Sequence, residues 1–167
     1  DLEEVKHYYE NIRWKMSGDI QKDYYGIMYP LKPNLNKVIY VNKGLWDKKT
    51  KLKFYKQNNE TYVSQSLIEG MFGDKYDEVE VDILKNLMEE NNHEKIDILK
   101  LDIEGAEIKV LNTMLDNNIF PTYICVEFDL YLKKKDKNNE TQTVIKRLEK
   151  NYKVIANQNG NVTFKLN

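Results

Sequence analysis

The sequence predicts an α/β fold in which a mostly parallel sheet ends in an antiparallel hairpin. Strand-like and helix-like runs alternate through the second half of the chain. The run IDILKLD at residues 96–102 is nearly continuous in its apolar character, as buried parallel strands are. Asn159-Gly160 is a strong signal for a tight hairpin turn. We therefore expect helices on both faces of a sheet that an antiparallel pair closes.

The first half of the chain predicts one helix and two strands. Apolar and aromatic residues fall at helical spacing over residues 2–15, and a glycine- and proline-punctuated loop follows over residues 17–33. The β-branched and aromatic run KVIYVN at residues 37–42 predicts a strand. A turn over residues 42–50 leads to a second strand, KLKFY at residues 51–55, in which apolar residues alternate with lysines.

The second half predicts strand and helix pairs in regular order. The alternating run EVEVD at residues 78–82 is typical of a strand, and residues 82–92 show helical spacing. A βαβ unit follows, formed by a strand at 96–102, a helix at 106–118 and a strand at 121–130. An amphipathic helix at 141–151 then precedes the two strands of the hairpin at 152–167.

Composition and charge exclude several classes of protein. The chain has 167 residues, 41% hydrophobic and 32% charged, which is enough for one domain with a core. Its 26 basic and 27 acidic residues leave a net charge of -1, so no overall field favours nucleic acid. The single cysteine, Cys125, excludes a disulfide framework, and the separated His7 and His93 are more typical of a surface than of a metal pair. Without an apolar run of roughly 18 residues or a recognisable signal peptide, a membrane span is not expected and a cytoplasmic location is favoured.

Two carboxylates, Asp102 and Glu104, stand at the exit of the predicted strand at residues 96–102, directly before Gly105. In open α/β sheets, ligands bind outside the carboxyl ends of the strands. A carboxylate there can bind a cationic centre, accept a proton or hold a metal, and spacing alone does not choose among these roles. The alternative is that one of the two acids only caps the helix that starts near Ala106. We favour a ligand site because a glycine permits close backbone approach at the same point.

The segment KLDIEGAE at residues 100–107, followed by Val110 and Leu111, resembles the signature of the FkbM-type S-adenosylmethionine-dependent methyltransferases. The similarity extends over residues 36–131 and includes VIYVNKGLWDKKTKLKFY, SQSL, EVEVDILKNLM and YICVEFD in the family's order. The resemblance implies a Rossmann-like class I methyltransferase sheet, mostly parallel, and methyl transfer from S-adenosylmethionine, commonly to an oxygen of a sugar or small natural product.

The resemblance also implies roles for particular residues. Asp102, Glu104 and Glu127 match acids at the carboxyl ends of two strands and are the expected catalytic residues. The expected cofactor-binding residues are Asp1, Gly44, Leu45 and Asp102. Asp1 matches an acid that binds the cofactor ribose, whereas Gly44 and Leu45 match a turn beside the adenine. A strand-end salt bridge is the alternative role for Glu127, and Gly44 is otherwise a turn glycine. No metal ligand is expected.

The sequence departs from the family pattern in one respect. The family carries a glycine-rich turn after its first strand, and none of the seven glycines of this chain forms such a cluster. We therefore expect residues 1–167 to form a single, N-terminally incomplete methyltransferase domain that lacks its first two strands. The missing strands are then expected to come from another polypeptide or from a segment upstream of Asp1, or the sheet is rebuilt without them. The isolated chain is expected to bind S-adenosylmethionine weakly or not at all.

Two functions follow as hypotheses. The first is methylation of a hydroxyl on a sugar or small-molecule acceptor, with activity of this chain alone in doubt because the glycine turn is absent. The second is a non-catalytic, methyltransferase-like subunit with a structural or interaction role in a larger assembly. A nucleotide-binding oxidoreductase is disfavoured because it requires the same absent turn.

Overall fold

The computed structural model describes residues 38–58, 64–136 and 138–167. The chain divides into two compact units, Asp1–Asn42 and Lys43–Asn167. Asp1, the predicted helix at residues 2–15 and the predicted loop at 17–33 lie outside the described residues. Residues 38–42 carry no strand, and Val38, Ile39 and Tyr40 are exposed, so the strand predicted at 37–42 is wrong over its described part. The prediction of one domain over residues 1–167 stays a prediction.

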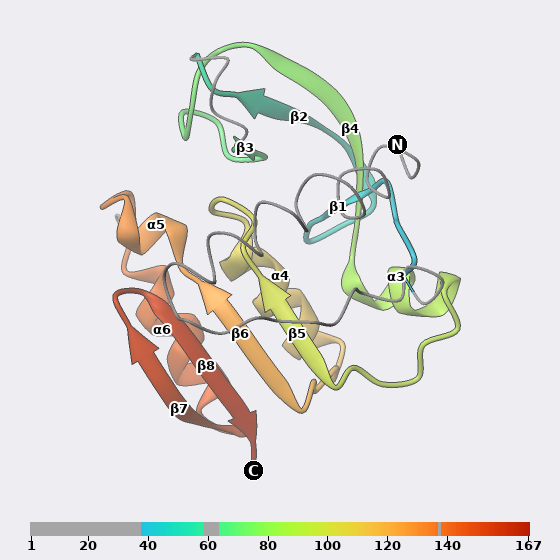
Figure 1. Ribbon diagram of the computed structural model, residues 1–167, viewed down its shortest axis with the longest axis vertical. Coiled ribbons are helices and arrows are strands. Elements are labelled where there is room, and N and C mark those ends of the chain that lie inside the picture. Colours follow the sequence, from blue (N-terminus) through green and yellow to red (C-terminus); the bar gives the residue numbers. More distant parts are fainter. Residues whose placement is uncertain (1–37, 59–63, 137) are drawn as a thin grey trace, which may run out of the picture. The chain divides into compact units, whose positions relative to one another are not determined.

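The second unit contains two four-stranded sheets, which we call sheet A and sheet B (Figure 1). Sheet A has the order β1-β4-β2-β3, with bounds β1 (Gly44–Leu45), β4 (Tyr76–Asp82), β2 (Thr50–Lys56) and β3 (Gln65–Ser66). Only the pair β1 and β4 is parallel; β2 is antiparallel to both β4 and β3. The predicted strands at 51–55 and 78–82 are confirmed as β2 and β4, whereas β1 and β3 were not predicted as strands.

Sheet B has the order β5-β6-β8-β7, with bounds β5 (Ile98–Leu101), β6 (Tyr123–Glu127), β8 (Asn161–Leu166) and β7 (Tyr152–Gln158). The strands β5 and β6 are parallel, and the helix α4 (Glu107–Asp116) connects them, so the predicted βαβ unit is confirmed. The strands β7 and β8 form the predicted antiparallel hairpin, which turns at Asn159 and Gly160, both with positive φ.

Three further helices complete the described part of the chain. They are α3 (Leu84–Glu90), α5 (Asp129–Leu132) and α6 (Glu140–Leu148). The spacing at residues 82–92 and 141–151 predicted α3 and α6. The short helix α5 was not predicted, because its four residues are too few to establish a helical period.

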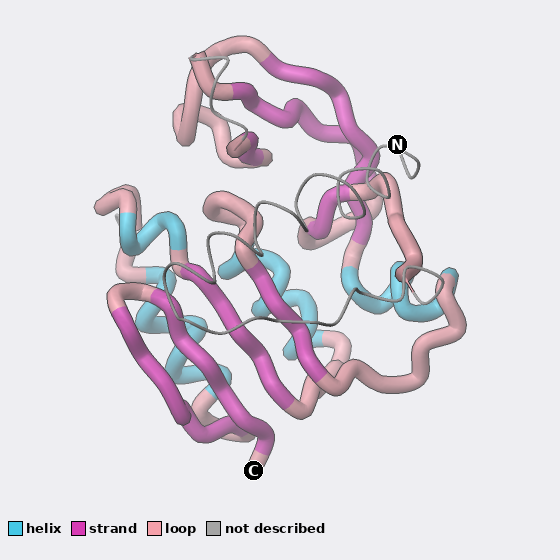
Figure 2. The backbone as a smooth tube through the Cα atoms, in the orientation of Figure 1, coloured by secondary structure: helices cyan, strands magenta, loops and turns pink. Residues whose placement is uncertain are grey.

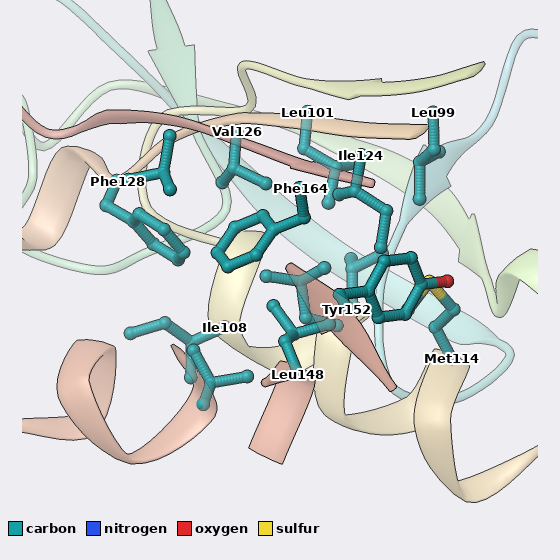
Figure 3. Packing of buried hydrophobic residues seen from close by; sticks show 14 residues of the cluster. Leu99, Leu101, Ile108, Met114, Ile124, Val126, Phe128, Leu148, Tyr152 and Phe164 are labelled. Atoms are coloured by element: carbon teal, nitrogen blue, oxygen red, sulfur yellow. The ribbon is translucent and has the colours of Figure 1, made fainter. Parts of the chain in front are cut away.

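The main core lies between sheet B and the helices α4 and α6, which cover the same face of that sheet (Figures 1 and 2). Figure 3 shows aromatic and aliphatic side chains from the strands meeting those of the two helices. Alternate strand residues such as Leu99 and Leu101 point into this core. On the opposite face Ile98 is 66% exposed, and no helix in the described part of the chain covers it.

The predicted fold class is therefore wrong. The structure contains two mixed sheets with antiparallel pairs instead of one mostly parallel, Rossmann-like sheet with helices on both faces. The physical reason lies in the residue pattern of β2 and β4, in which apolar and charged residues alternate. Alternating apolar and charged residues are typical of antiparallel strands that expose one face to solvent. Strands of a parallel sheet that is covered on both faces are apolar at nearly every position.

Candidate functional site

A cavity of about 350 Å³ lies between sheet A and the loop that follows β5. Its lining residues are Gly44, Leu45, Phe54, Ser64, Gln65, Leu67, Asp102, Ile103 and Glu104. We call it the acidic-loop cavity. It brings together four residues that the sequence singled out, Gly44, Leu45, Asp102 and Glu104, from segments far apart in the chain. Glu127 does not line this cavity, and Asp1 lies outside the described residues.

The acidic loop at residues 102–106 has an unusual backbone. Glu104 has φ +56° and Gly105 has φ +107°, both in the left-handed region. An L side chain rarely adopts the conformation of Gly105, and a Cβ there would lie 3.1 Å from Ile68 Cγ1 and 3.2 Å from Met71 Cε. A glycine at this position therefore allows the loop to turn sharply from β5 into α4 while it packs against residues 68–71.

The buried carboxylate of Glu107 holds this turn from inside. Its Oε1 accepts hydrogen bonds from the backbone amides of Ile103 at 3.1 Å and Gly105 at 3.0 Å. Burial raises the pKa of Glu107, although these backbone hydrogen bonds oppose the rise. The helical spacing of residues 106–118 predicted Glu107 in the helix but did not predict this role. The signal was an acid in the first turn of a helix, where free backbone amides need acceptors.

Ser66 ties the loop to sheet A. Its side chain is fully buried, and its Oγ donates a hydrogen bond to the carbonyl oxygen of Glu104 at 2.6 Å. The same Oγ accepts a hydrogen bond from the backbone amide of Ile68 at 3.0 Å. The hydroxyl therefore links β3, the segment that follows it and the acidic loop.

The side chain of Glu104 is engaged by Lys133, which follows α5. Lys133 Nζ donates hydrogen bonds to Glu104 Oε2 and, at 2.5 Å, to Asp129 Oδ1. Burial raises the pKa of Asp129, and the lysine only partly opposes this rise. For Glu104, the hydrogen bonds from Lys133 and Ser64 outweigh the effect of burial and hold its pKa below the usual value. These three side chains, Glu104, Asp129 and Lys133, form what we call the Lys133 cluster.

Asp129 is the main residue of the site that the sequence analysis missed. Its side chain is 7% exposed, and its Oδ2 is buried without a hydrogen-bond partner in the described part of the chain. The acid that the resemblance predicted here is Glu127, the last residue of β6. Glu127 is half-buried and pairs in register with Asn161 on β8. Strand alternation places Glu127 on the face of sheet B that the helices do not cover.

Asp102 is the acid in the cavity with the most freedom to meet a ligand. Its side chain is 52% exposed, and its only ion pair among the described residues is with Lys100 at 3.4 Å, where both partners are about half exposed. An exposed pair of this kind contributes little and is easily exchanged. The rest of the lining is partly apolar, with Leu45, Phe54 and Leu67. The cavity therefore combines an available negative charge with a surface suited to a flat apolar group.

A second acid at a strand end, Asp82, has a structural role. It is fully buried, and its Oδ1 accepts hydrogen bonds from the Ile83 amide at 2.9 Å and from Asn86 Nδ2 at 2.6 Å. Its Oδ2 lies 3.7 Å from Lys43 Nζ and 3.9 Å from Lys49 Nζ. Burial would raise the pKa of Asp82, but these hydrogen bonds and lysines lower it below its usual value. The carboxylate thereby fixes the start of α3 against β4.

One model of a known protein family matches most of the chain. The family model described as Methyltransferase FkbM domain matches residues 23–160. The chain belongs to the FkbM methyltransferase family. The resemblance inferred from KLDIEGAE is thus confirmed, and the match includes β5, the acidic loop, α4 and β6. Searches of curated proteins and of solved structures found no match to the chain.

The described residues contain neither a candidate metal site nor a candidate membrane-spanning helix. Within residues 38–58, 64–136 and 138–167, no three acidic, histidine or cysteine side chains come together in a way that could hold a metal ion. In the same ranges, no helix combines the length and apolar character that crossing a bilayer requires.

Proposed function

We propose that this chain takes part in methyl transfer from S-adenosylmethionine to a hydroxyl oxygen of a sugar or another small molecule. The observation that carries the proposal is the acidic-loop cavity, in which Asp102 and Glu104 of the family signature lie beside Gly44 and Leu45. The family membership supports methyl transfer in general, and the chemistry of the cavity supports the choice of cofactor.

The residues of the cavity fit part of this cofactor. S-adenosylmethionine carries a positive charge near its reactive carbon, and the available carboxylate of Asp102 attracts a cation. Leu45, Phe54 and Leu67 offer apolar surface for a purine, and Ser64 and Gln65 offer polar groups at the same wall. The volume of about 350 Å³ lies at the lower end of the range of roughly 300–1,000 Å³ for small-molecule sites.

Each acid then has a distinct task in the proposed reaction. When bound, the cofactor supplies a methyl group on a positively charged sulfur. Asp102 would orient the acceptor hydroxyl towards that methyl group and accept the proton that the hydroxyl loses. Glu104 is already held by Lys133, so we assign it the positioning of the loop instead of proton transfer. Glu127 and Asp1 stay predictions from the family pattern.

The test is a matched pair of variants, Asp102→Asn and Asp97→Asn. Asp97 is an exposed acid just before β5, far from the acidic loop along the strand, and pairs with Lys95. We expect Asp102→Asn to lower methyl transfer by about 10²–10⁴-fold, and Asp97→Asn to leave it unchanged. Transfer is measured with isotopically labelled S-adenosylmethionine and a panel of small hydroxyl compounds, and circular dichroism checks the fold. Equal turnover in both variants would remove Asp102 from the mechanism.

A second candidate function is a non-catalytic subunit that binds another polypeptide. Two observations favour it: Glu104 is occupied by Lys133, and in the described part of the chain β5 pairs only with β6 and leaves Ile98 exposed. A partner strand could extend sheet B at β5. For this function Asp102→Asn should leave assembly intact, whereas Ile98→Pro, which removes a backbone donor from the edge of β5 that does not pair with β6, should weaken it. An assembly that size-exclusion chromatography finds unchanged in Ile98→Pro would contradict the proposal.

A further inference from the structure

A second cavity of about 230 Å³ lies between the helices α5 and α6 and the turn of the β7–β8 hairpin. We call it the hairpin cavity. It shares no lining residue with the acidic-loop cavity. Figure 1 shows the hairpin turn beside α5 and α6, at the end of sheet B where β6 also ends. Nothing in the proposed methyl transfer uses this cavity.

Backbone contacts fix the walls of the hairpin cavity. The amide of Phe128 donates a hydrogen bond to the carbonyl oxygen of Gly160 at 3.0 Å, which ties the hairpin turn to the end of β6. Leu132 packs so closely on the turn that a Cβ at Gly160 would lie 2.6 Å from its Cδ2. The turn therefore has little room to move relative to α5, and the cavity is largely preformed.

The first turn of α6 forms the wall of the cavity opposite the hairpin turn. The positive end of this helix is already neutralised by a carboxylate. The carboxylate of Asp136 accepts hydrogen bonds from the backbone amides of Glu140 at 2.8 Å and Thr141 at 3.1 Å. The free amides that could attract an anion are thus engaged by a carboxylate. No charged side chain lines the cavity. A charged ligand would find no counter-charge there.

The polar groups that line the hairpin cavity are all neutral. Gln142, Asn157 and Asn159 present exposed carboxamides, each of which can both donate and accept hydrogen bonds. The hydroxyl of Thr141 is buried, and its Oγ1 has no hydrogen-bond partner within the described residues. Buried hydroxyls usually have partners, so this group marks an unmet hydrogen bond at the cavity.

An aromatic surface completes the cavity. Tyr131 lines it and is 52% exposed, and the buried ring of Phe128 forms part of the apolar floor with Ile145 and Val162. An exposed aromatic ring beside several carboxamides suits a ligand with one apolar face and many hydroxyl groups. The volume is below the roughly 300 Å³ at which pockets begin to hold drug-sized molecules, so one ring fits.

We propose that the hairpin cavity binds a neutral, polyhydroxylated ring, which is a single monosaccharide unit. Gln142 and Asn157 hydrogen-bond its hydroxyls, and Tyr131 packs against its apolar face. The site differs from a nucleobase site, because only one of its rings has exposed surface and a flat base is usually held between two.

The experiment uses the whole chain and ligand-observed NMR with four probes: methyl α-D-glucopyranoside, methyl α-D-mannopyranoside, methyl β-D-galactopyranoside and N-acetyl-D-glucosamine. We expect at least one probe to bind. The double variant Gln142→Ala and Asn157→Ala should weaken that binding at least roughly tenfold, because it removes at least one hydrogen bond. The matched control is Gln158→Ala, an exposed amide on β7 that does not line the cavity and should bind normally.

Three outcomes overturn the proposal. The first is no binding of any probe to a chain that circular dichroism shows to be folded. The second is binding that survives in the double variant but is lost in Asp102→Asn, which places the sugar in the acidic-loop cavity. The third is binding of inorganic phosphate or adenosine, but of no sugar, that the double variant abolishes. Because the readout is sugar binding, a failure here is distinct from a failure of methyl transfer.

Discussion

The Lys133 cluster provides the sharpest prediction for this protein. Lys133→Met keeps the length of the side chain and removes its charge and its hydrogen bonds to Glu104 and Asp129. The carboxylate of Asp129, which is 7% exposed, is then left without any partner in the described part of the chain. Leaving a buried charge unpaired is one of the few single changes that cost several kcal/mol.

The magnitude follows from how buried each partner is. Removing one partner of a fully buried ion pair costs about 3–5 kcal/mol, whereas an exposed pair contributes about 0–1 kcal/mol. The side chain of Lys133 is 33% exposed, so water can replace part of what the ammonium provides. We therefore expect a loss of about 2 kcal/mol at neutral pH, which corresponds to a melting temperature lower by about 4–8 °C in a chain of this size.

The loss should depend on pH, with a sign that the pKa shifts determine. Burial raises the pKa of Asp129, so the folded state binds this proton more tightly than the unfolded state does. The contribution of Asp129 to the stability of the folded protein therefore falls as pH rises from about 4 through its folded pKa. Lys133 opposes that loss. It also lowers the pKa of Glu104 against burial, which adds stability above about pH 4.3 that disappears on acidification. Both contributions make the advantage of the native protein over the variant grow with pH.

The assay is urea unfolding followed by circular dichroism at about pH 4.5 and about pH 7.5. The matched control is Lys134→Met, which changes the adjacent exposed lysine. Lys133→Arg, which keeps the charge, should recover part of the stability. The reasoning is refuted if Lys133→Met loses no more stability than Lys134→Met at the higher pH, or if its loss is the same at both pH values.

Three further predictions concern stability. Gly105→Ala should lose about 1–3 kcal/mol, because φ is +107° and the new Cβ would lie 3.1 Å from Ile68 Cγ1. Ser66→Ala should lose about 1–2 kcal/mol, because the partly buried carbonyl of Glu104 loses its 2.6 Å donor. Tyr152→Phe should lose about 1 kcal/mol, because its buried hydroxyl donates to a backbone carbonyl at 2.9 Å. Burial raises the pKa of Tyr152 to about 12, so the native protein should lose stability as pH rises from 10 to 12, and Tyr152→Phe should not.

Urea unfolding measures all three variants, and each has its own contradicting result. A Gly105→Ala protein as stable as Gly70→Ala, whose position has positive φ but open space for a Cβ, would show that packing around Gly105 is unimportant. Ser66→Ala should lose more than Ser64→Ala, and the reverse order would contradict the role of the Ser66 hydroxyl. For Tyr152, an alkaline loss that persists in the phenylalanine variant would assign the titration to another group.

Local patterns in the sequence identified much of this fold. The helical spacing of residues 106–118 predicts α4, the apolar runs on either side predict β5 and β6, and Asn159-Gly160 predicts the turn of the hairpin. These signals hold because the residues that form such elements are neighbours in the chain or lie one turn apart. The family signature could be read for the same reason, since KLDIEGAE is continuous in sequence.

The arrangement of the strands required information that no local pattern contains. A parallel sheet was expected, yet β2 pairs antiparallel with β4 across a connection of about twenty residues. The alternating residues of β2 and β4 favoured antiparallel strands with one exposed face. Such a pattern does not specify with which other strand each one pairs. The strand expected at residues 37–42 shows the same limit, because β-branched residues favour a strand only where a neighbour supplies hydrogen bonds.

The sequence by itself determined the family, the βαβ unit, the hairpin and the presence of Asp102 and Glu104 at a strand exit. Tertiary structure decided what those acids touch. Lys133 reaches Glu104 from 29 residues away, and Ser66 reaches it from 38. Because a hydrogen bond or ion pair depends on distances of a few ångströms between atoms, only the folded chain could separate the engaged Glu104 from the available Asp102.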